Sequence, residues 1–158
     1  MLISKELADR IRHAFYAYIF LSYRKVDRGF ANTLMRLIHS IPDCRDFAIW
    51  FDKFLTPGES FKANIEKALD DCKLFTLLVT QRLFKKNVDE NGEDVDNFVI
   101  TNELPMAKDK RVEKGTEIFA IEMEDIGEDV QTTLEADEYV SFNDAAFRER
   151  FLAVISKI

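Results

Sequence analysis

Short apolar runs recur along the chain, and they are too short to be helices. They lie at 17–22, 46–51, 73–80, 116–123 and 138–142. The runs that begin at Asp46 and Leu74 lack strict alternation with polar residues, which predicts strands buried on both faces. Such strands are typical of a parallel sheet that helices cover on both sides.

Between these runs, apolar residues recur at helical spacing. The clearest stripe consists of Phe61, Ile65, Ala68, Leu69 and Cys72. This spacing puts one apolar face of a helix against the sheet. Ser60 is its candidate N-cap, and Pro57-Gly58 marks the turn before it. Further helices are predicted at 3–15, 28–41, 97–108 and 144–158, and the acidic stretch 125–137 is predicted to be irregular or weakly helical.

The alternation of strands and helices predicts an α/β fold with a flavodoxin-like, doubly wound sheet. We expect five parallel strands in the order 2-1-3-4-5, with helices on both faces. Residues 1–158 are expected to form a single domain with an N-terminal helical extension at 1–16, which is either complete or a module of a longer protein. The polar stretch 85–97 is too long for an ordinary connection, so it is expected to be functional or disordered.

The predicted strand order also predicts where a ligand binds. The order reverses between strands 1 and 3, and ligands of doubly wound sheets bind at such a point, outside the carboxyl ends of the strands. The loops concerned begin at Ser22 and at Thr80.

The charge and cysteine content disfavour several classes of partner. The net charge is -7, and much of the acid lies between Glu113 and Glu138, so a nucleic-acid surface is not expected. Cys44 and Cys72 lack metal-site spacing and fit a reducing compartment. The longest apolar run, residues 14–21, is too short to span a bilayer, and the N-terminus does not resemble a secretory signal. We therefore expect a cytoplasmic protein without a membrane partner.

Familiar catalytic motifs are missing from the sequence. It has no glycine-rich dinucleotide fingerprint and no phosphate loop, so no bound cofactor is expected. The only histidines, His13 and His39, lie on predicted helices, which disfavours a histidine triad or a zinc site. Thr80 ends the third strand where a phosphoacceptor receiver domain would need an aspartate.

Three segments carry a resemblance to a known family. They are Phe20-Leu21-Ser22-Tyr23 at the end of strand 1, Asp52 to Gly58 after strand 2, and Asn97 to Ala107 after strand 3. In this order they resemble the first box, the BB loop and the glutamate-bearing segment of Toll/interleukin-1 receptor (TIR) domains. The resemblance covers residues 17–158, and the residues of the second and third segments are similar to those of bacterial members.

The resemblance implies two functions. The first is an NAD glycohydrolase, or a cyclase that makes a cyclic ADP-ribose isomer, in bacterial immunity against phage, with NAD as substrate and Glu103 as catalytic residue. One carboxylate suffices for this chemistry, because the nicotinamide departs as a neutral molecule without protonation, unlike the leaving group of an ordinary glycoside. The alternative is a non-enzymatic module that docks other TIR domains through its BB loop.

Several further residues are predicted to serve these functions. The expected substrate contacts are Tyr23, Arg24, Lys25, Asp52, Thr80 and Val99, and the expected assembly contacts are Phe54, Pro57 and Gly58. Val99 stands where NAD-cleaving members often have tryptophan. Alternatives remain for some of them: Glu103 as a solvated helix residue, Arg24 as a partner of Asp27 or Asp52, Asp52 as a loop cap, and Phe54 as a packing residue.

Overall fold

The structure is a computed structural model, and it describes residues 18–44, 48–50, 61–85, 87–88, 91, 94–95, 99–126 and 129–156. The helices are α2 (Arg28–Ser40), α3 (Phe61–Asp71), α4 (Leu104–Lys114), α5 (Asp129–Leu134) and α6 (Phe147–Ile155). The strands are β1 (Tyr18–Ser22), β2 (Ala48–Trp50), β3 (Leu74–Val79), β4 (Asn87–Val88), β5 (Asp94–Val95), β6 (Glu117–Glu122) and β7 (Glu138–Ser141). Short turns of 3₁₀-helix lie at Lys25–Asp27 and Pro42–Cys44, and a π-helical turn lies at Val99–Glu103.

The main sheet is parallel and has the order β2-β1-β3-β6-β7. β1 pairs with β2 on one side, where Ile19 is in register with Ile49, and with β3 on the other, where Ser22 is in register with Leu77. The predicted α/β class, with a parallel sheet and helices, is confirmed. The order reverses between β1 and β3, so these two strands border the switch point of the sheet.

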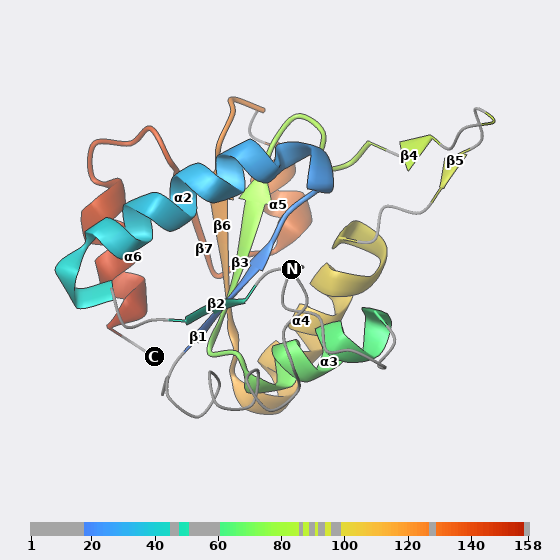
Figure 1. The fold of residues 1–158 in the computed structure, drawn as a ribbon, viewed down its shortest axis with the longest axis horizontal. Coiled ribbons are helices and arrows are strands. Elements are labelled where there is room, and N and C mark those ends of the chain that lie inside the picture. Colours follow the sequence, from blue (N-terminus) through green and yellow to red (C-terminus); the bar gives the residue numbers. More distant parts are fainter. Residues whose placement is uncertain are drawn as a thin grey trace.

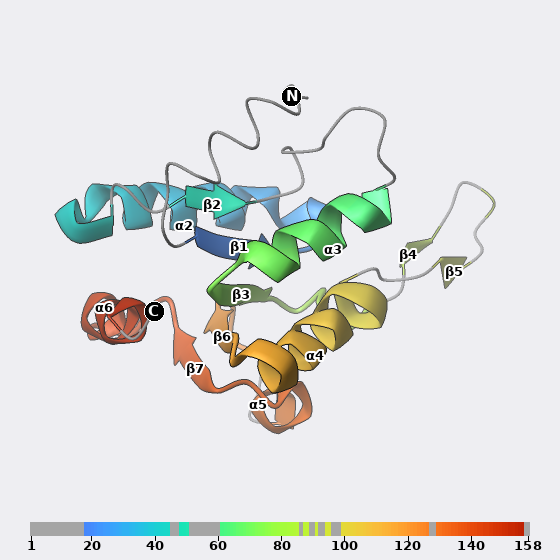
Figure 2. The same cartoon turned by 90° about the horizontal axis from the view of Figure 1, so that it is seen from below.

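Helices cover both faces of the sheet (Figures 1 and 2). One apolar cluster joins the sheet to α2 and α6, and the other joins it to α3, α4 and α5. β3 is buried along its whole length and supplies both clusters. Leu74 and Leu78 face α2 and α6, whereas Phe75, Leu77 and Val79 face the other side. Burial on both faces explains why this strand is apolar without alternation.

The segment from β3 to β6 differs most from the prediction. The stretch 85–97, which is expected to be functional or disordered, contains β4 and β5, an antiparallel pair that stands away from the body of the domain (Figure 1). The helix predicted at 97–108 is instead the π-helical turn followed by α4. It ends at Lys114 because Gly115 adopts a left-handed φ of 76° and its N–H bonds to the carbonyl of Arg111, a common way to end a helix.

The predicted closing helix begins three residues late. It was expected from Asp144, but α6 starts at Phe147. The carboxylate of Asp144 accepts a hydrogen bond from the N–H of Ala146 at 2.9 Å. That local turn competes with a helical start at Asp144, as short acidic side chains commonly do.

Candidate active site

A buried serine and a buried glutamate meet at the carboxyl end of β1. Ser22 is the last residue of the strand, and Glu103 is the last residue of the π-helical turn. The Ser22 hydroxyl donates a hydrogen bond to Glu103 Oε1 at 2.9 Å. Ser22 is 0% exposed and Glu103 is 9% exposed. The carboxylate therefore lies beside the switch point, and its predicted alternative as a solvated helix residue is wrong.

Local sequence explains how Glu103 reaches this position. Pro105 lies in the first turn of α4, where proline is tolerated because its missing N–H would have no helical partner. The turn that precedes it is wider than an α-helix, and such π-turns occur often at functional sites. Val99 and Leu104 anchor the segment in the cluster beneath α3 and α4.

The residues after β1 have three different environments. Tyr23 is buried in the cluster that contains α2 and α6, and Lys25 is exposed. Arg24 is buried, and its Nη1 donates to the carbonyl oxygens of Arg82 at 2.5 Å and Lys85 at 2.7 Å. The guanidinium thus holds the turn that follows β3, a role that the sequence did not suggest.

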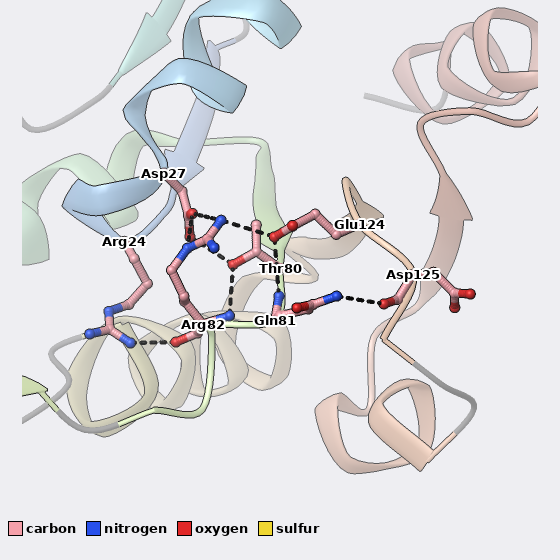
Figure 3. A network of polar contacts seen from close by, with 7 residues as sticks. All are labelled: Arg24, Asp27, Thr80, Gln81, Arg82, Glu124 and Asp125. Carbon is pink, nitrogen blue, oxygen red and sulfur yellow. Dashed lines mark hydrogen bonds and ion pairs between the residues drawn. The ribbon is translucent and has the colours of Figure 1, made fainter.

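A polar network joins the loops that leave β1, β3 and β6 (Figure 3). Asp27 accepts from the Thr80 hydroxyl at 2.7 Å and from Arg82 Nε at 2.7 Å. Arg82 Nη2 reaches Glu124 Oε1 at 2.9 Å. The hydrogen bond with Asp27 raises the pKa of the Arg82 guanidinium, which keeps it charged. We call Arg24, Asp27, Thr80 and Arg82 the loop clamp.

The sequence predicts Thr80 as a substrate contact, but the structure shows it as part of the loop clamp. Its side chain is buried, and its hydroxyl also accepts from the N–H of Arg82 at 3.3 Å. This hydroxyl therefore links two loops to each other. Val99, another residue predicted to contact the substrate, is buried in the cluster beneath α4.

Some predicted site residues lie outside the described residues. These are Asp52, Phe54, Pro57 and Gly58. Sequence reasoning did not select Ser22, Asp27 or Arg82. Ser22 lay within a quoted motif, at a strand end. Asp27 and Arg82 carried a weaker signal, namely opposite charges shortly after two neighbouring strands.

Two general findings concern other kinds of site. Within the described parts of the chain, no group of three or more histidine, cysteine, aspartate or glutamate residues is placed to hold a metal ion. No helix among the described residues is long and apolar enough to cross a bilayer.

The decisive comparison is with protein families. A family model described as "TIR domain" matches residues 19–155. The chain belongs to the TIR domain family. The match runs from β1 to α6 and includes both Ser22 and Glu103. No curated protein matches the chain significantly. TIR domains include NAD-cleaving enzymes and signalling modules, and they commonly interact with other TIR domains.

Proposed function

We propose that this TIR domain cleaves NAD and that Glu103 is its catalytic residue. The observation that carries the proposal is the position of a carboxylate, 9% exposed, at the carboxyl end of β1 beside the switch point. Ligands of doubly wound sheets bind at this point. The resemblance to bacterial members extends the proposal to immunity against phage.

The reaction breaks the bond between ribose C1′ and the nicotinamide nitrogen. The nitrogen takes both bonding electrons, so the cationic ring leaves as neutral nicotinamide and positive charge develops on the ribose. Water then adds at C1′ and loses a proton, giving ADP-ribose; in a cyclase, an atom of the same nucleotide adds instead. A carboxylate held beside C1′ stabilises the developing positive charge, and such preorganised electrostatics is usually the largest catalytic term.

Asp27, the second acid that is buried in the described part of the chain, is poorly suited to this role. Asp27 is bound to the guanidinium of Arg82 and to the Thr80 hydroxyl, so its charge is offset by a cation. The hydrogen bond that Glu103 accepts from Ser22 comes from a neutral hydroxyl. Such a bond orients a carboxylate without neutralising it.

The test is nicotinamide release from NAD, followed by chromatography over a range of protein concentrations. We expect release, with a rate per molecule that rises with concentration because TIR activity generally depends on assembly. The products also separate hydrolysis from cyclisation, since only hydrolysis yields ADP-ribose directly. No nicotinamide at any concentration, including that at which the protein self-associates, contradicts the proposal.

A second candidate function is non-enzymatic docking of another TIR domain. One observation favours it: Val26 and Phe84 are 69% and 44% exposed, and they lie on the two loops that Arg24 joins. Exposed apolar side chains on loops that are tied together in this way are candidates for an interaction surface. Self-association that Val26→Asp and Phe84→Asp abolish, without nicotinamide release by the wild type, supports this function over the first.

A further inference from the structure

The hydroxyl that contacts Glu103 is held on a rigid part of the fold. β1 lies inside the sheet, with β2 on one side and β3 on the other. Two residues before Ser22, the ring of Phe20 stacks on that of Phe75 with centroids 5.4 Å apart. Ser22 itself is 0% exposed and in register with Leu77. Because pairing on both sides and burial fix the backbone at Ser22, the Glu103 side chain has to adopt the rotamer that reaches the hydroxyl.

The carboxylate of Glu103, by contrast, lies at the end of a side chain with three rotatable bonds. It lies where the π-helical turn passes into α4, and fixing a glutamate side chain in one rotamer has an entropic cost. A hydrogen bond between a hydroxyl and a carboxylate is about twice as strong as one between neutral groups. The bond from Ser22 therefore selects one orientation and favours the charged form.

We propose that Ser22 is a positioning residue for Glu103. It donates to Oε1, fixes the plane of the carboxylate at the switch point, and holds the group ionised for the developing charge on the ribose. This inference rests on the proposed function, because it assigns Ser22 a role in the same site. The serine acts through Glu103, without taking part in bond making or breaking.

The test compares Ser22→Ala with a matched control. Ser141→Ala makes the same change at the end of β7, another parallel strand of the same sheet. We expect Ser22→Ala to lower kcat about 10- to 100-fold, the rate equivalent of one hydrogen bond to a charged group. KM should change less than about twofold, since Ser22 is fully buried and its one assigned contact is Glu103. Ser141→Ala should keep wild-type kcat.

A purely structural role for Ser22 would not move the pH profile. Removing a donor to the carboxylate disfavours its charged form, so the acid limb of kcat against pH should shift upward by about one unit. The carboxyl ¹³C titration of Glu103, assigned by its loss in Glu103→Gln, should move the same way. Ser22→Thr keeps the hydroxyl, so its pH profile and its Glu103 titration midpoint should both be close to those of the wild type.

The outcomes separate this inference from the proposed function. If the wild type releases nicotinamide and Ser22→Ala matches it in kcat and pH profile, the positioning role is overturned and the proposed function stands. If the wild type releases none, the ¹³C titration still decides. If the midpoint of this titration is higher in Ser22→Ala than in the wild type, the result supports the interaction of Ser22 with the Glu103 carboxylate. An unchanged midpoint overturns the inference.

Discussion

Asp27 and Arg82, 55 positions apart in the sequence, form an ion pair across the switch point, with Arg82 Nε 2.7 Å from Asp27 Oδ1. Each of the two loops donates a hydrogen bond to the other. Arg24, from the loop after β1, donates to the main-chain carbonyl of Arg82, while Arg82 donates to Asp27 in that same loop. The loops that border the proposed NAD site are thus tied to each other in both directions.

Asp27→Ala should destabilise the domain. It leaves the buried Thr80 hydroxyl without its acceptor, and an unsatisfied buried polar group costs about 1–3 kcal/mol. Urea unfolding measures the change. The control is Asp125→Ala, because Asp125 is exposed and its contact with Gln81 uses the main-chain carbonyl. Equal midpoints for wild type and Asp27→Ala would show that the loop clamp does not contribute to stability.

Two buried threonines, one within β3 and one directly after it, should respond in opposite ways to the same substitution. Thr76 is 0% exposed, and its hydroxyl has no hydrogen-bond partner among the described residues, whereas the Thr80 hydroxyl bonds to Asp27. Valine has nearly the shape of threonine without the hydroxyl. Thr76→Val should therefore stabilise the domain by about 1 kcal/mol, and Thr80→Val should destabilise it by a similar amount. Denaturant midpoints that move in the same direction would contradict this account of the two hydroxyls.

Two glycines offer another matched pair. Gly115 ends α4 with a φ of 76°, whereas Gly29 lies in α2 and an added Cβ there meets nothing within 4 Å. Gly115→Ala forces a left-handed conformation on an L residue and should cost about 1–2 kcal/mol. Gly29→Ala should instead stabilise the helix by about 0.5–1 kcal/mol. Thermal melting of both variants checks the two signs, and a Gly115→Ala variant as stable as the wild type would contradict the assigned backbone.

The fold was predicted correctly from the sequence where burial requires a recognisable pattern of apolar residues. β3 and β6 are apolar because helices cover both their faces, and the stripe at Ile65 and Leu69 is apolar because it lies against the sheet. The prediction was weaker where burial is slight. Only Leu104 and Ala107 of α4 are buried, so its polar second half had no periodicity to detect. β4 and β5 have two residues each, too few for any pattern.

The candidate site was predicted only in part, for a different physical reason. Glu103 was selected through the resemblance of its segment, but its partner Ser22 is 81 residues away. A contact over that distance depends on the strand order and on the turn before α4, neither of which a local pattern specifies. The loop clamp has the same origin, because Asp27 and Arg82 meet only when β1 and β3 are neighbours.

The central claim, that Glu103 is the catalytic carboxylate, has one direct test. Glu103→Gln keeps the size of the side chain and an acceptor for Ser22 but loses the charge. Glu113→Gln makes the same change at an exposed position of α4 and serves as the control. Nicotinamide release is measured at equal protein concentration, with a melting curve for each variant. The account predicts a loss of about 10²- to 10³-fold for Glu103→Gln, with a melting temperature near that of the wild type and full activity in the control. A folded Glu103→Gln variant that releases nicotinamide at close to the wild-type rate would contradict it.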